Sequence, residues 1–140
     1  MGVRDAYRER EIDAVVIDFT PAMQDVWAVT DLCISRCGAS TCAELTAAGI
    51  ASILMPYPFH KDMHQRANAQ VLVDAGAALL VDDEKDAKKN ADKLKPAVES
   101  LLYEQTRRQQ MAAAARAIGK PNAAEGVAAI VIEMTEANVD

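Results

Sequence analysis

The stretch DLCISRCGASTCAELTAAG, residues 31–49, decides the fold because its pattern changes in the middle. The apolar run LCIS at 32–35 predicts a buried strand. The alanine-rich run from Thr41 to Ala48, followed by Gly49, predicts a helix with a normal C-terminal stop. A strand that leads through a short loop into a helix is the first half of a βαβ unit.

The same alternation continues on both sides of this stretch. Further strands are predicted at 14–18, 51–56 and 78–81, and helices at 3–11, 21–30, 63–75, 93–102, 104–118 and 123–136. This order predicts an α/β fold with a parallel sheet. Because ligands on such sheets bind at the carboxyl ends of the strands, the loops 19–22, 36–41 and 57–65 are the predicted site.

Composition limits the class of protein. The chain has 140 residues, 51% of them apolar, which predicts one domain with a real core. It carries 15 basic and 21 acidic side chains, and this net charge of −6 argues against a broad nucleic-acid surface. No apolar run is long enough to span a membrane, and the polar N-terminus contains no secretory signal. The spacing of Cys33, Cys37 and Cys42 fits no metal or redox motif, which predicts buried, reduced thiols.

Two interpretations of the loop before the second predicted helix stay open on spacing alone. Thr41 and Glu44 have the spacing of a capping box, in which each side chain bonds the other residue's backbone amide. The amides at a helix start also attract phosphate, and Gly38 lets the backbone approach closely. Arg36 either bonds such an anion or pairs with a nearby carboxylate. Glu44, one turn into the helix, is placed to accept hydrogen bonds from a ribose diol.

A second polar cluster surrounds the start of the helix at 63–75. Asp62 begins another capping pattern, and Gln65 and Asn68 lie on the first turns. These two amides either form an ordinary polar face or bond sugar hydroxyls. His60 and His64 are four residues apart, but no third ligand accompanies them, so we expect no metal site.

The remaining signals are single residues or missing motifs. Phe19 follows the predicted strand at 14–18 and either packs on the next helix or caps a base at the mouth of the site. The chain contains no GxSxG, P-loop or GxGxxG motif, so the sequence gives no signal for a covalent hydrolase or for nucleotide hydrolysis.

Three blocks together resemble a known family. FTPAM (19–23), DLCISRCGASTCAELTAAGIASILMPYP (31–58) and DMHQRANAQVLVDAGAALLV (62–81) are similar, in order, to the C-terminal half of the MurG family. MurG proteins are bacterial glycosyltransferases that add N-acetylglucosamine to a lipid-linked muramyl-pentapeptide. The resemblance implies the GT-B arrangement of two Rossmann-like domains, with this chain as the half that binds UDP-N-acetylglucosamine through a partial Rossmann-like parallel sheet.

The resemblance also implies roles for individual residues. Phe19 and the backbone of Thr20 would border the uracil, and Glu44 would bond the ribose hydroxyls. The loop beside the diphosphate and the sugar would comprise Arg36, Gly38, Ala39, Ser40 and Thr41.

Further implied roles concern the sugar and the chemistry. Gln65 and Asn68 would read the hydroxyls of the N-acetylglucosamine, with His64 as an additional contact. The family inverts the anomeric centre by direct attack of the acceptor hydroxyl and uses no metal or other cofactor. The lipid-linked acceptor implies a cytoplasmic protein at the inner face of the plasma membrane.

The family pattern predicts that residues 1–140 form one truncated domain. The acceptor-binding domain and the first strands of the donor domain would be absent, so we expect little activity from the chain alone and assign no catalytic base. The strand at 14–18 would lack its neighbours. We therefore expect the chain to form a homodimer or to need a complementing segment.

Other functions remain open at this stage. One alternative is a different nucleotide-sugar transferase of the same superfamily, such as a lipid glucosyltransferase or a two-chain eukaryotic enzyme. A second is a non-catalytic nucleotide-binding module. A third alternative is a segment that folds but has no function of its own. Binding of UDP compared with UDP-sugars, and transfer when an acceptor domain is supplied, would distinguish these alternatives.

Overall fold

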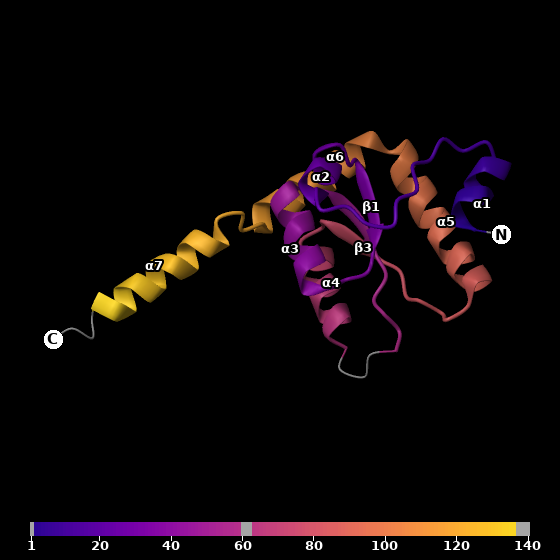
Figure 1. The fold of residues 1–140 in the computed structure, drawn as a ribbon. Coiled ribbons are helices and arrows are strands. Elements are labelled where there is room, and N and C mark those ends of the chain that lie inside the picture. The colour runs from indigo at the N-terminus through magenta and orange to yellow at the C-terminus, as the bar shows by residue number, and fades with distance from the viewer. Residues whose placement is uncertain (1, 60–62, 137–140) are drawn as a thin grey trace.

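The centre of the molecule is a three-stranded parallel sheet in the order β1-β2-β3 (Figure 1). The computed structural model describes residues 2–59 and 63–136. The strands are β1 (Leu32–Ser35), β2 (Ala51–Leu54) and β3 (Ala78–Leu80). All three predicted strands from residue 32 onward are therefore confirmed, and so is the parallel sheet.

Helices precede, connect and follow these strands. They are α1 (Val3–Glu9), α2 (Met23–Ala28), α3 (Ala39–Ala48), α4 (His64–Asp74), α5 (Ala87–Tyr103), α6 (Gln105–Ile118) and α7 (Ala123–Glu136). Because α3 joins β1 to β2 and α4 joins β2 to β3, the chain contains two consecutive βαβ units, as predicted. None of the helices in the described ranges is both long and apolar enough to cross a membrane.

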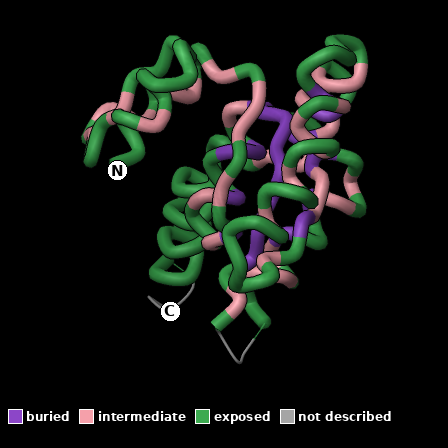
Figure 2. The backbone as a smooth tube through the Cα atoms, turned by 90° about the vertical axis from the view of Figure 1, so that its right-hand side faces the viewer, coloured by how far each residue is buried: buried purple, intermediate pink, exposed green. Residues whose placement is uncertain are grey.

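The core lies on both faces of the sheet. Leu45 of α3 and Leu72 of α4 pack with Leu54 on one face. Leu101 of α5 and Met111 of α6 join the cluster on the other face. All four residues of β2 are buried, as expected for the central strand of a sheet covered on both sides. The buried positions gather around the sheet, while the N-terminal helix lies apart from them (Figure 2).

The predicted strand at 14–18 is wrong. This β-branched run forms no strand, and the side chains of Val15 and Phe19 are 88% and 83% exposed. A strand requires a ladder partner, and in the described chain β1 pairs only with β2, which leaves its other edge open. The run is instead attached through Arg4, whose Nη2 donates to the carbonyl oxygen of Val16 at 2.8 Å.

Two helix starts also differ from the prediction. Pro21 lies before α2 and not in its first turn, because the Thr20 hydroxyl accepts the Ala22 amide at 3.1 Å and holds a turn there. The helix predicted at 93–102 begins earlier, at Ala87, because the Asp86 side chain caps it by accepting the Lys89 amide. The charged composition of 87–92 hid this first part of α5.

The end of α6 lies against α3 at Gly119. A Cβ atom at this position would stand 2.5 Å from the carbonyl oxygen of Thr46, which is too close for any real contact. Gly119 therefore allows α6 and α3 to approach at the backbone. This packing positions α3 for the site, because the loop at the carboxyl end of β1 leads directly into α3.

We predict that Gly119→Ala lowers the free energy of unfolding by about 1–3 kcal/mol, the usual cost of overpacking, because backbone rather than a flexible side chain must move. Urea unfolding followed by circular dichroism measures the change. The matched control is Gly126→Ala, whose added Cβ would meet open space in α7. An unchanged midpoint for Gly119→Ala would contradict the proposed close packing.

Candidate functional site

The loop between β1 and α3 exposes the start of a helix. The first hydrogen bond of α3 joins the Cys42 amide to the Gly38 carbonyl at 3.0 Å. The amides of Ala39, Ser40 and Thr41 therefore precede the first acceptor, and no side chain caps the helix. The capping box predicted for Thr41 and Glu44 is wrong, because the helix starts two residues earlier with Gly38 as its N-cap.

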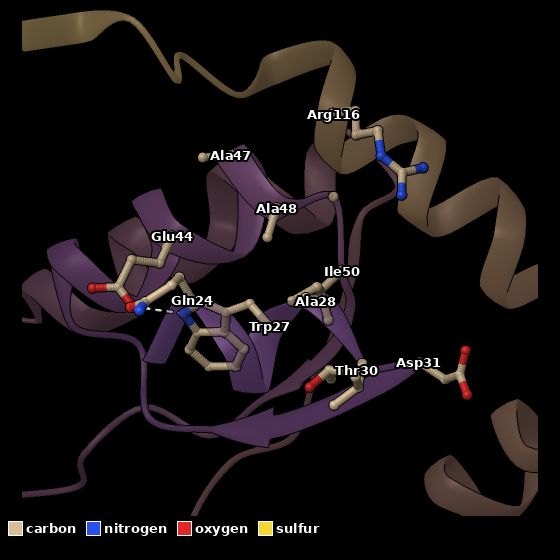
Figure 3. A pocket seen from close by; sticks show the side chains of 12 residues that line it. Gln24, Trp27, Ala28, Thr30, Asp31, Glu44, Ala47, Ala48, Ile50 and Arg116 are labelled. Carbon is tan, nitrogen blue, oxygen red and sulfur yellow. Dashed lines mark hydrogen bonds between the residues drawn. The ribbon is translucent and has the colours of Figure 1, made fainter. Parts of the chain in front are cut away.

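Glu44 faces a cavity instead of its own helix start. Its Oε2 accepts a hydrogen bond from Nε1 of Trp27 at 2.8 Å. The cavity has a volume of about 610 Å³ and lies between α2, α3 and Arg116 of α6. Figure 3 shows Glu44 and Trp27 at one end, with Arg116 and Asp31 toward the other.

Arg36 ties together the ends of the strands. Its Nη1 donates to the carbonyl oxygens of Met55 and Pro56 at 3.2 and 3.1 Å. Its Nη2 pairs with Oδ2 of Asp83 at 2.7 Å. Of the two roles predicted for Arg36, pairing with a carboxylate is the one found in the structure. The guanidinium therefore joins the loop after β1 to the segments that follow β2 and β3.

Asp83 is held in its ionised form by several donors. Asn90 Nδ2 and the Lys85 amide both donate to Oδ1 at 2.8 Å, while Arg36 bonds Oδ2. Together the hydrogen bonds from Asn90, Arg36 and the Lys85 backbone lower the pKa of Asp83 from 3.8 to about 2. No spacing rule predicts the pair of Arg36 and Asp83, because the two residues are 47 positions apart in the chain.

Gln65 and Asn68 of α4 attach to the same loop. Oε1 of Gln65 accepts the amides of Cys37 and Tyr57 at 3.3 and 2.9 Å. Nδ2 of Asn68 donates to the Cys37 carbonyl at 3.1 Å. The other polar atom of each side chain, Gln65 Nε2 and Asn68 Oδ1, bonds nothing among the described residues. Both residues thus fix the loop and keep one group for a ligand.

The N-terminus of α4 differs from the predicted cap. Its N-cap is Met63, in the left-handed region at φ 56°, with no side-chain cap. His60 and Asp62 lie outside the described residues. His64 is exposed at the first position of α4. Within 2–59 and 63–136, no group of three or more His, Cys, Asp or Glu side chains is arranged to hold a metal ion.

Phe19 and Thr20 are absent from the lining of the cavity beside Glu44. Phe19 is 83% exposed, so its predicted packing on the following helix is wrong. The Thr20 side chain is used in the turn before α2, and neither residue lines the cavity of Glu44. The segment that carries them has no strand partner to fix it beside the sheet.

The cysteines are free, as predicted, and Cys37 and Cys42 are buried, whereas Cys33, predicted to be buried as well, is only half-buried. Burial, and secondarily the neighbouring Cys42, raises the pKa of Cys37 to about 12. Burial also raises the pKa of Cys33 and of Cys42. These thiols stay protonated and serve as small core side chains.

We predict that Asp83→Asn lowers the free energy of unfolding at neutral pH. In acid, the free energies of unfolding of the variant and of the unchanged chain should become more similar. Because the folded state lowers this pKa from 3.8 to about 2, the carboxylate stabilises the fold above pH 3.8, and that contribution is lost as the pH falls to about 2. Urea unfolding at a series of pH values measures it.

The matched control for this experiment is Asp82→Asn. Asp82 is the preceding residue, and its ion pair with Arg66 is exposed, so its loss should change stability little. The prediction would be contradicted if Asp83→Asn lowered the free energy of unfolding by the same amount at every pH from neutral to pH 2.

Comparisons with known proteins agree with this architecture. The chain is 41% identical over 128 residues to the UDP-N-acetylglucosamine--N-acetylmuramyl-(pentapeptide) pyrophosphoryl-undecaprenol N-acetylglucosamine transferase of Xanthomonas euvesicatoria, covering 91% of this chain and 29% of that protein. It is 39% identical to the protein of the same name from Methylococcus capsulatus, and the match covers 93% of this chain and 36% of that protein. The chain thus spans about a third of the length of these relatives.

A solved structure and a family model identify the domain. The crystal structure of Acinetobacter baumannii MurG superposes with a TM-score of 0.76 at 29% identity, covering 92% of this chain and 38% of that one. This confirms the predicted fold as part of a GT-B glycosyltransferase. The model of the glycosyltransferase family 28 C-terminal domain matches residues 3–127, and the chain therefore belongs to that family.

Proposed function

We propose that this chain is the donor-binding part of an inverting glycosyltransferase of peptidoglycan synthesis. The complete enzyme would transfer N-acetylglucosamine from UDP-N-acetylglucosamine to the lipid-linked muramyl-pentapeptide, the reaction named for the relatives. One observation carries the proposal: three backbone amides at the start of α3 have no acceptor among residues 2–59 and 63–136, and Glu44 lies one turn further on.

The diphosphate of the donor would bind at the start of α3. The amides of Ala39, Ser40 and Thr41 supply donors, and the helix dipole adds partial positive charge. Gly38 presents no side chain toward the ligand. Arg36, although paired with Asp83, keeps about half of its side chain exposed beside this loop. These groups would stabilise the negative charge that develops on UDP as it leaves, so the proposal requires no metal ion.

The nucleoside and the sugar would bind on either side of the diphosphate. The Glu44 carboxylate accepts hydrogen bonds from the ribose hydroxyls. Phe19, whose side chain is exposed, and the backbone of Thr20 would border the uracil.

On the sugar side, Gln65 and Asn68 offer one donor and one acceptor. The Nε2 group of Gln65 and Oδ1 of Asn68 are the atoms that the loop contacts leave unused. His64, exposed at the start of α4, is a further proposed contact. A sugar held by these groups presents its anomeric carbon beside the amides that hold the departing diphosphate.

The chemical step would be direct attack of the acceptor hydroxyl on the anomeric carbon. The new glycosidic bond forms as the bond to the UDP oxygen breaks, and the hydroxyl proton passes to a general base. We assign no such base within this chain. The acceptor is a lipid-linked glycan, which would place the complete enzyme in the cytoplasm against the inner face of the plasma membrane. The proposal involves no nucleic acid.

The first test is calorimetric titration of the chain with UDP-N-acetylglucosamine, UDP-glucose and UDP. We expect saturable binding with preference for the N-acetylated sugar. Glu44→Gln should weaken binding of all three about ten- to a hundredfold, the effect of losing hydrogen bonds to a charged group. Asn68→Ala should weaken the two UDP-sugars more than UDP. No binding by a folded chain would overturn the proposal.

Two variants serve as controls in this titration. Glu125→Gln removes the same charge from α7, and Gln70→Ala removes an exposed amide of α4 that donates to Asp74 at 2.7 Å. Both should bind as the unchanged chain does. If the controls and the site variants lost binding affinity equally, the loss would reflect a general effect of charge or stability and would contradict specific contacts of Glu44 and Asn68 with the donor.

We also propose that the open edge of β1 mediates association with a second copy or with a complementing segment. Ile34 of β1 is 48% exposed, and Val15 and Ile17 of the unpaired run are exposed as well. Analytical ultracentrifugation should detect a dimer that dissociates on dilution. Ile34→Lys, a charge on an edge strand, should favour the monomer. A chain that is monomeric at all concentrations would contradict self-association.

A further inference from the structure

We infer that Trp27 is a positioning residue of the donor site, which holds the Glu44 carboxylate for recognition of the ribose. The inference rests on the function proposed above, because it concerns the same carboxylate. The observation that carries it is the 2.8 Å hydrogen bond from the indole Nε1 to Oε2 of Glu44.

The indole ring is itself fixed by the core. Trp27 lies near the end of α2 and is packed against the core cluster that contains Leu45 of α3. A ring held by packing on one side directs its single N–H donor along a fixed line. The neighbouring helix places Glu44 at the end of that line (Figure 3).

The hydrogen bond from Trp27 is what fixes the Glu44 carboxylate in the described part of the chain. The Glu44 side chain is exposed, and among the described residues the indole is the one group that donates to its carboxylate. A free glutamate samples many rotamers, and ordering it on binding costs entropy. Trp27 reduces that cost because the carboxylate is already oriented in the empty site.

The hydrogen bond leaves capacity for a ligand. A carboxylate has about four acceptor positions, and the indole occupies one of them on Oε2. The remaining positions can accept both hydroxyls of a vicinal diol. Trp27 also forms a wall of the cavity of about 610 Å³ beside the carboxylate. The pair should therefore distinguish a ribose from a 2′-deoxyribose more sharply than a mobile glutamate would.

The test compares UDP with 2′-deoxyuridine diphosphate on the chain and on Trp27→Phe, which keeps an aromatic ring and removes the N–H donor. We expect the variant to bind UDP about fivefold more weakly, the effect of one ordinary hydrogen bond, and to bind the deoxy nucleotide nearly as before. The ratio of the two affinities is the decisive reading, because a purely structural defect would weaken both ligands alike.

A double-mutant cycle tests whether Trp27 acts through Glu44. In a Glu44→Gln background, Trp27→Phe should have a clearly smaller effect on UDP affinity. Independent effects that simply add would overturn the inference. The chain has a single tryptophan, so the indole N–H signal in NMR is unambiguous, and it should shift more on addition of UDP than of the deoxy nucleotide. This second reading needs no variant to fold.

The outcomes separate the two proposals. If the unchanged chain binds UDP and Trp27→Phe keeps both its affinity and its discrimination, the positioning role is overturned and the donor site stands. If the folded chain binds neither nucleotide, the proposed function is overturned together with the role of Trp27. Loss of ribose discrimination in the variant, with binding of the deoxy nucleotide retained, supports both.

Discussion

The guanidinium group of Arg36 is the contact on which the arrangement of the site depends. It follows β1, bonds the two carbonyls that follow β2, and pairs with Asp83 shortly after β3. In a parallel sheet these segments end at the same edge, so one side chain can reach all of them. The Asp83 side chain is only 7% exposed, and Asn90 and Lys85 hold it from behind.

This clamp acts together with the amides of α4. Gln65 and Asn68 bond the backbone of Cys37 on both its N–H and its C=O, next to Arg36 in the chain. The loop that leads into α3 is thus held by all three strand ends and by α4. The amides at the start of α3 are oriented before any ligand arrives. Such pre-organisation is what makes backbone donors effective toward a developing charge.

The sequence predicted most of the fold because its signals are local. The runs that end at Gly49 and Gly76, and the apolar runs that follow them, were sufficient to predict α3, β2, α4 and β3. The run at 14–18 has the same composition as a true strand, yet strand formation depends on a partner that composition does not reveal.

The candidate site was predicted less completely. Spacing identified Glu44, Gln65 and Asn68 as polar residues in the first turns of two helices that follow strands, but it did not identify their partners. Trp27 is 17 residues from Glu44 and Asp83 is 47 residues from Arg36, so only the folded chain brings these pairs together. The capping box is absent for a different reason. Gly38 is the N-cap of α3, so Thr41 and Glu44 lie inside the helix and do not cap it.

The position of β1 connects the two proposals made for this chain. One edge of β1 pairs with β2, its other edge is open, and its carboxyl end leads directly to Arg36 and the loop before α3. A strand that pairs with the open edge would further stabilise the segment of β1, loop and α3 that a bound donor nucleotide would also stabilise. Two binding events that stabilise one segment are linked, and the linkage is reciprocal. Completion of the sheet would then strengthen donor binding, and a bound donor would favour completion of the sheet.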